Sequence, residues 1–252
     1  MTIVRRIPKF SVSAVVRVAI GLALVACLLV DAAGWVEIRA LTQLELWAYD
    51  ARVRLFLPRT RDPRIVIVDI DEKSLSAEGH WPWQRDKLAL MLHQLFARYG
   101  VRVVAFDLAF PEPDTNASLP VLEAAASGDL RDDAAFQAFL QRVRPSLDYD
   151  RTFAEEIQEH PVVLGFLVSA QTQRSGILPR PAFPMSALAN AEYRYFTGPG
   201  YSGNIAPLQA AATAAGHLYQ ALDLDGVTRS VPMFMQVGND FFEALSLAVL
   251  RV

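Results

Sequence analysis

Short apolar runs alternate with amphipathic segments along most of the chain. The apolar runs, each expected to form a strand covered on both faces, span residues 64–70, 101–106 and 161–168. The segments with apolar residues at helical spacing span residues 86–99, 134–143 and 152–159. Gly100 predicts the end of the first helix, and Asp150 is the expected N-cap of the third. This order predicts an α/β fold, with a mostly parallel sheet and helices on both faces.

The pattern changes in the C-terminal third. Residues 171–203 are rich in proline and glycine, which predicts a long functional or mobile loop. Residues 216–223 and 227–236 are predicted strands of a β-hairpin, because they flank Asp225-Gly226, a favoured turn. Residues 241–250 are predicted to form a helix.

The N-terminal pattern predicts one transmembrane helix. Residues 10–30 are apolar or small except for Arg17 and two serines, and about 20 such residues span a bilayer. Basic residues precede the apolar centre and the first acid is Asp31, so the N-terminus should stay cytoplasmic and the rest should be exported. A signal peptide cleaved near Asp31 would also export the domain, whereas a buried core helix fits the one-sided arginines poorly.

A second amphipathic helix is expected over residues 35–56. Gly34 is the one helix breaker between Val30 and Phe56, so this helix should be continuous, or nearly so, with the anchor. It could lie along the membrane or pack against the base of the domain. We therefore divide the chain into a cytoplasmic N-terminus and anchor (1–33), a juxtamembrane helix (34–58) and an extracytoplasmic domain (59–252).

Composition narrows the function classes. The net charge of −3 provides no electrostatic basis for binding nucleic acid. Lysine occurs only at Lys9, Lys73 and Lys87, which limits Schiff-base and P-loop chemistry, and the single Cys27 excludes an intrachain disulfide. The four histidines, His80, His93, His160 and His217, lack the spacing of metal ligands.

Carboxylates follow the first two predicted strands. Asp69 and Asp71 would share one strand face, Asp107 ends the next strand, and Glu112 and Asp114 lie just beyond it. Paired strands would gather these acids at one sheet edge, where they could bind an amine or a divalent cation, or act as acid and base. Alternatively, the aspartates cap the following turns.

An aspartate-x-aspartate after a strand also resembles the opening of haloacid-dehalogenase phosphohydrolases. However, Glu72 and Lys73 stand where that family has Gly-Thr, and its later motifs are not evident.

Trp81-Pro82-Trp83 joins a stiff backbone to two large rings. The rings could form an aromatic wall for a ligand or pack the loop onto the sheet. Arg85 could form an ion pair with one of the acids. We therefore include Trp81, Trp83 and Arg85 with the five acids as candidate ligand-binding residues, with Asp69, Asp71 and Asp107 as the candidate metal ligands.

Several of these motifs together resemble the second type of CHASE domain, an extracytoplasmic sensory module of bacterial cyclases, histidine kinases and serine/threonine kinases. The motifs that carry the resemblance lie at residues 49–52, 65–72, 79–85, 106–114 and 225–229. The resemblance covers about residues 45 to 252 and transfers no binding residues. It implies an exported sensor that follows a transmembrane helix and precedes further helices and a cytoplasmic effector.

We therefore expect a non-catalytic sensory domain of an inner-membrane protein, facing the periplasm or cell exterior and sensing a small molecule or ion. The chain should be the N-terminal part of a larger signalling protein, with the module incomplete at its C-terminus and the full-length protein a homodimer. Two alternatives remain open: an exported metal-dependent hydrolase using Asp69, Asp71 and Asp107, and a purely structural scaffold.

Overall fold

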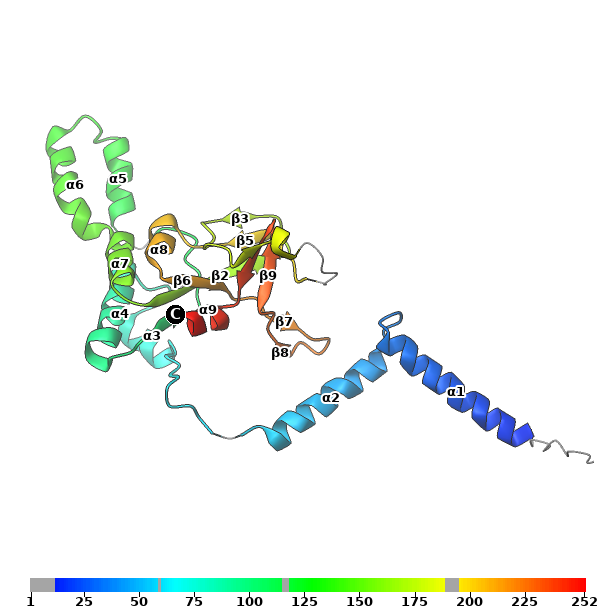
Figure 1. Ribbon diagram of the computed structural model, residues 1–252. Helices are drawn as coiled ribbons and strands as arrows, with labels where there is room; N and C mark the ends of the chain where they lie inside the picture. Colours follow the sequence, from blue (N-terminus) through cyan, green and yellow to red (C-terminus); the bar gives the residue numbers. More distant parts are fainter. Residues whose placement is uncertain (1–11, 59, 115–117, 189–194) are drawn as a thin grey trace, which may run out of the picture. The chain divides into compact units, whose positions relative to one another are not determined.

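The computed structural model describes residues 12–58, 60–114, 118–188 and 195–252 (Figure 1). The chain forms two compact units, Met1–Ile67 and Val68–Val252. The second unit contains the strands of the fold and all the candidate site residues.

The first unit contains two helices separated by a turn. α1 spans Val12–Ala32 and α2 spans Arg39–Phe56. Gly34 has a φ of +71° and donates its backbone N–H to the Asp31 carbonyl, while the Asp31 side chain accepts from the Ile38 N–H at 2.8 Å. The expectation of a nearly continuous helix is therefore wrong, because a left-handed glycine and the bond from the Ile38 N–H to the Asp31 carboxylate turn the chain here.

Within the residues that the structure describes, no helix has the length and apolarity needed to cross a membrane. The predicted span begins at Phe10, outside the described residues.

The main sheet of the second unit is built around β2 (Val162–Ser169). This strand pairs in parallel with β1 (Val104–Phe106) and β6 (Ala214–His217). Near its end it pairs antiparallel with β5 (Gly200–Ser202), which runs parallel to β3 (Arg174–Ser175). The prediction of an α/β fold with a mostly parallel sheet is confirmed.

Helices cover both faces of this sheet. Val162, Leu164 and Phe166 share a buried cluster with residues of α4 (Arg85–Tyr99), α7 (Tyr149–Gln158) and α8 (Ala206–Ala211). Val163 points the other way and packs with Ala214 of β6 and Ala248 of α9 (Leu245–Arg251). Side chains along β2 point alternately to these two covered faces, so the first half of the strand is apolar at every position.

The predicted strand at residues 64–70 is wrong. This segment has no strand pairing, and Ile65, Val66 and Ile67 are 74, 77 and 89% exposed. A β-branched run favours an extended backbone, but a strand forms only where a neighbouring strand supplies the hydrogen bonds. Among the described residues, β1 pairs with β2 alone, and the segment leads into the short helix α3 (Glu72–Glu78).

The C-terminal third is divided among three sheets. The predicted long loop contains β3, β4 (Phe183–Pro184), a 3₁₀ turn η1 (Met185–Leu188) and β5; residues 189–194 lie outside the described part. β7 (Ala221–Leu222) and β8 (Thr228–Ser230) pair antiparallel on either side of Asp225-Gly226. This pairing is shorter than predicted, because β6 joins the main sheet and β9 (Phe234–Val237) joins β4 and β10 (Asp240–Glu243).

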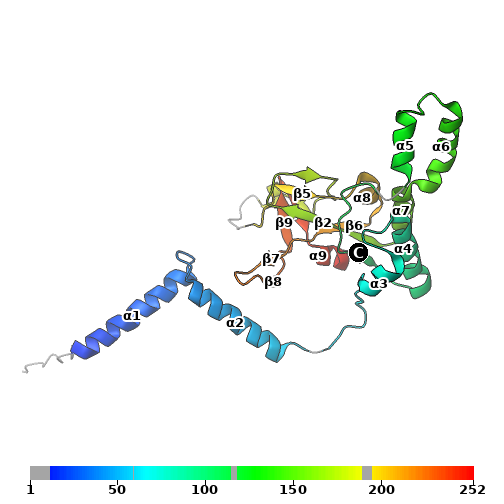
Figure 2. The ribbon, with the colours of Figure 1, turned by 180° about the vertical axis from the view of Figure 1, so that it is seen from behind.

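The short helices α3 and α8 and a helix at Leu119–Ser127 were not predicted, and the other helices differ from prediction at their ends. The predicted C-terminal helix starts at Leu245 rather than at residue 241, because Phe241 and Phe242 are buried in β10. α5 (Leu119–Ser127) and α6 (Ala134–Leu147) lie side by side and extend away from the sheet of their unit in both views (Figures 1 and 2). Helices α4, α6 and α7 confirm the three helices predicted from apolar spacing.

Candidate functional site

The structure does not gather the first three predicted carboxylates at a sheet edge. Asp69 and Asp107 are exposed, and Asp71 is the N-cap of α3. The Asp71 carboxylate accepts hydrogen bonds from the Ser74 hydroxyl at 2.7 Å and backbone N–H at 2.8 Å, which lower the pKa of Asp71. Because residues 64–70 form no strand, the pairing that would bring the three acids together is missing from the described residues.

This placement gives no support to a metal-dependent hydrolase built on those acids. Within the described part of the chain, one group of three potential ligands has converging atoms, and it contains none of Asp69, Asp71 and Asp107. Asp71 instead matches the capping interpretation that the sequence left open.

Four other predicted residues do come together. They line a pocket of about 140 Å³ formed by two loop segments, whose lining residues are Pro82, Trp83, Arg85, Pro111, Glu112, Pro113 and Asp114. Arg85 begins α4, and the remaining residues precede that helix or follow β1. The pocket therefore lies where the loop after β1 meets the N-terminus of α4.

The two tryptophans have different surroundings. Trp83 is buried, and its indole Nε1–H donates to the Gly79 carbonyl at 2.9 Å, which satisfies its polar atom. Trp81 is 38% exposed and meets Trp83 edge to face, with ring centroids 6.0 Å apart. The peptide bond between Trp81 and Pro82 is cis. Trp83 is thus part of the packed core, and Trp81 contacts it from the surface.

A chain of polar contacts connects this pocket to α7. The backbone N–H of Arg85 donates to Asp114 Oδ2 at 2.8 Å, and the backbone N–H of Asp114 donates to Asp150 Oδ2 at 2.8 Å. The other carboxylate oxygen of Asp150 lies 3.5 Å from Arg85 Nε. The Arg85 guanidinium also lies over the Phe110 ring, 4.5 Å from its centroid.

Burial dominates the electrostatics of this pair. The side chains of Arg85 and Asp150 are 11% and 16% exposed. Desolvation raises the pKa of Asp150, although the Asp114 N–H and the Arg85 charge oppose it; desolvation likewise lowers the pKa of Arg85. Arg85 Nε and Asp150 Oδ1 have no hydrogen-bond partner among the described residues. A water or a polar ligand atom could bridge two such groups.

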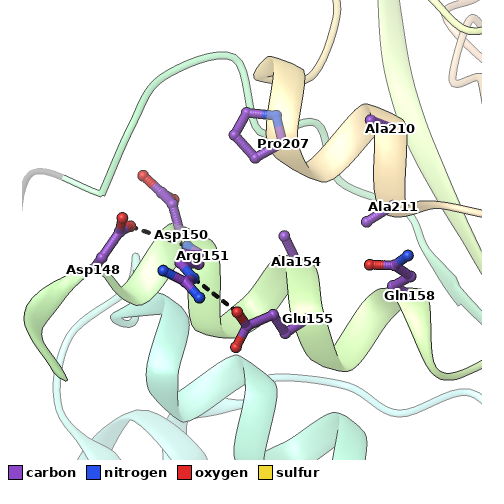
Figure 3. A pocket seen from close by; sticks show the side chains of 9 residues that line it. All are labelled: Asp148, Asp150, Arg151, Ala154, Glu155, Gln158, Pro207, Ala210 and Ala211. Atoms are coloured by element: carbon purple, nitrogen blue, oxygen red, sulfur yellow. Dashed lines mark hydrogen bonds and ion pairs between the residues drawn. The ribbon is translucent and has the colours of Figure 1, made fainter. Parts of the chain in front are cut away.

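Asp150 also lines a second and larger concavity. This groove, of about 410 Å³, runs between α7 and α8 (Figure 3); its lining residues are Asp148, Asp150, Arg151, Ala154, Glu155, Gln158, Pro207, Ala210 and Ala211. Asp150 lines the groove while Arg85 and Asp114 line the smaller pocket, so the contact between Arg85 and Asp150 links the two.

The groove has an acidic side and an apolar side. α7 and its N-cap contribute three carboxylates, of Asp148, Asp150 and Glu155, and the single cation Arg151, which pairs with Glu155 at 2.7 Å (Figure 3). α8 contributes Pro207, Ala210 and Ala211. This arrangement suits a small ligand that combines a cationic group with an apolar part.

Sequence reasoning missed the position of Asp150 opposite Arg85. It was the predicted N-cap of α7, but the cap is Asp148, whose carboxylate accepts from the Arg151 N–H at 3.1 Å. Only one of two acids two residues apart can cap the helix, and the sequence does not show which one faces Arg85. The sequence nevertheless shows two aspartates, Asp148 and Asp150, close together where this helix begins.

Sequence reasoning also missed Asn204, which anchors the chain at Phe110, just before the pocket-lining segment that starts at Pro111. Asn204 is fully buried; its Oδ1 accepts from the Phe110 N–H at 2.8 Å, and its Nδ2 donates to the Gly165 carbonyl at 3.1 Å. It thereby ties the loop that carries Phe110 to the central strand β2. Phe110 in turn supports the guanidinium of Arg85.

Comparisons with known proteins identify one similarity. A family model described as "CHASE2 domain" matches residues 21–252, a range that includes both pockets. Neither a curated protein nor a solved structure matches the chain.

Proposed function

The chain belongs to the CHASE2 domain family, whose members are sensory domains of signalling proteins, and from this premise we propose that it is the extracytoplasmic input domain of a membrane-anchored signal-transduction protein. The observation that carries the proposal is the extent of the family match, residues 21–252. The effector that it controls would be a cyclase, a histidine kinase or a serine/threonine kinase.

The N-terminal segment would supply the anchor. Residues 10–30 are long and apolar enough in sequence to cross a bilayer, and the basic residues that flank their N-terminal side favour a cytoplasmic N-terminus. The second unit would then lie outside the cytoplasm, where it can meet signals from the environment.

The groove between α7 and α8 is the proposed ligand site. Its three carboxylates favour a small molecule with an amine or another cationic group, and its alanine and proline wall favours an apolar part. A ligand amine bound to Asp150 would compete with Arg85 for that carboxylate. Since Arg85 begins α4 and contacts Asp114, binding on α7 would change the contacts of α4 and of the loop after β1.

Cysteine labelling in cells tests the location. In a Cys27→Ala background, Asp129→Cys places a thiol on an exposed part of the second unit, and Thr2→Cys places one at the N-terminus. We expect a membrane-impermeant maleimide to label Asp129→Cys in intact bacterial cells with a permeabilised outer membrane, and Thr2→Cys only after lysis. Labelling of Asp129→Cys only after lysis would contradict the proposal.

A ligand panel tests the groove separately. Small amines should raise the melting temperature of the purified full chain, whereas the matching alcohols should not, because the groove is acidic. Asp148→Asn and Glu155→Gln should weaken the effect, while Asp129→Asn, an acid away from the groove, should leave it unchanged. If none of the amines acts, the assignment of the groove is wrong, whereas the location is judged by labelling alone.

A further inference from the structure

Two histidines and a glutamate converge where α4 packs against the C-terminal part of α7. Nδ1 of His93 and Nε2 of His160 each lie 3.1 Å from the same carboxylate oxygen, Oε1 of Glu156. All three potential ligand atoms lie within 4.8 Å of one another. His93 comes from α4, Glu156 from α7, and His160 follows the end of α7.

We propose that His93, Glu156 and His160 form a binding site for a divalent transition-metal ion, with Zn²⁺ as the best match. Imidazole nitrogen and carboxylate oxygen are ligands that Zn²⁺ binds at about 2.0–2.2 Å. In a tetrahedral site with such bonds, neighbouring ligand atoms lie about 3.3–3.6 Å apart. The observed separations of 3.1 Å, and of up to 4.8 Å across the group, need only small side-chain rotations to reach this geometry.

The hard cations Ca²⁺ and Mg²⁺ fit this site less well. They prefer six or more oxygen ligands, or several retained waters, and two of the three ligand atoms here are nitrogens. The two nitrogen ligands therefore favour a metal ion softer than Ca²⁺ or Mg²⁺, such as Zn²⁺.

Two packed helices hold the ligands in place. Leu88 and Leu92 of α4 and Phe153 and Ile157 of α7 are fully buried in one core cluster. His160 has its own support, because its ring stacks on Phe96 with a centroid distance of 4.1 Å and an angle of 6°. Ligands on rigid elements lose little freedom when a metal binds, which favours affinity.

The site is open on one side. The side chain of His93 is 54% exposed, whereas those of His160 and Glu156 are 24% and 18% exposed. Three protein ligands with an accessible position are typical of zinc sites that bind a water or an exogenous ligand as the fourth partner. The metal could thus exchange with solvent, as a reversible signal or regulator requires.

This site is distinct from both pockets. Arg85, which lines the smaller pocket, and His93 are eight residues apart on α4, about 12 Å along the helix axis. Glu156 follows Glu155, which lines the groove, so the groove and the metal site share α7. None of the three metal ligands lines either pocket. The sequence did not reveal the site, because His93 lies 63 residues from Glu156 and no short motif contains both.

Metal titration of the full chain tests the proposal. We expect the purified, chelator-treated chain to bind one Zn²⁺ by calorimetry, and Co²⁺ to give the visible absorption of a tetrahedral site with nitrogen and oxygen ligands. His93→Ala, His160→Ala and Glu156→Gln should each weaken binding by about 100-fold or more, since loss of even an outer-shell partner costs 10–100-fold. His80→Ala removes an exposed histidine outside the site and should leave the affinity unchanged.

Two results would overturn the proposal. One is a full chain that shows no saturable Zn²⁺ binding; the other is a His93→Ala/His160→Ala variant that binds Zn²⁺ as tightly as the original chain. Circular dichroism of the metal-free variants controls for folding. The Co²⁺ spectrum of the unsubstituted chain gives a readout that does not depend on any substitution.

Discussion

Nε of Arg85 lies 3.5 Å from Oδ1 of Asp150, and this buried contact joins the start of α4 to the start of α7. Neither atom has a hydrogen-bond partner among the described residues, so the two charges attract each other without being fully satisfied. Such a pair contributes little net stability while intact, yet removing one partner leaves a buried charge.

Replacement of Arg85 should destabilise the folded chain. Arg85→Met leaves Asp150 buried without its counter-charge, and we expect the free energy of unfolding to fall by about 3 kcal/mol in urea titrations. Arg85→Met/Asp150→Asn, which removes the charge but keeps an acceptor for the Asp114 N–H, should recover most of the loss. Arg151→Met, which breaks the exposed pair with Glu155, is the control and should have little effect. Equal effects of Arg85→Met and Arg151→Met would contradict this view.

Asn204 should be essential for holding the loop at Phe110 against β2. Asn204→Ala leaves the buried Phe110 N–H and Gly165 carbonyl without the partner that they share, which should lower the free energy of unfolding by about 3 kcal/mol. Asn239→Ala, at an exposed position, serves as the matched control. If Asn204→Ala lowers the free energy of unfolding no more than Asn239→Ala does, other groups or water replace the amide.

His217 should make stability depend on pH. Burial lowers the pKa of His217 from 6.5 to about 4, so between these values the unfolded chain takes up a proton that the folded chain does not. The contribution of this histidine is fully present above pH 6.5 and is lost as the pH falls toward 4. We expect a loss of about 3 kcal/mol over this range.

The measurement compares the chain with a variant that cannot titrate. Urea titrations at pH 7 and pH 4 give the fall in the free energy of unfolding for each chain. This fall should be about 3 kcal/mol smaller in His217→Gln than in the original chain. His80→Gln, at an exposed histidine, should behave like the original chain. Parallel pH curves for the original chain and His217→Gln would show that His217 is not responsible.

Gly216 should tolerate no side chain. It lies on β6 where α9 begins, and a Cβ there would come within 2.5 Å of the backbone N and Cα of Leu245. Gly216→Ala should therefore push α9 away from the sheet and lower the free energy of unfolding by about 2–3 kcal/mol. Hydrogen exchange should localise the loss of protection to α9 and β6; an unchanged exchange pattern would contradict the proposed close packing.

The sequence by itself determined the elements whose signal is local. Helices α4, α6 and α7 follow from apolar residues at helical spacing, and Gly100 ends α4 in the left-handed conformation that its position required. β2 was recognisable because both of its faces are covered, which makes a continuous apolar run. The family was recognisable for a similar reason, because its motifs are short and contiguous.

Only the tertiary structure decided which distant groups meet. Residues 64–70 have the composition of a strand, but pairing depends on a partner that no local pattern specifies. Asp150 faces Arg85 rather than capping α7, and His93 meets Glu156 across 63 residues, because packing of α4 on α7 sets both contacts. The sequence contains every one of these side chains, but their chemistry depends on distances that only the folded chain fixes.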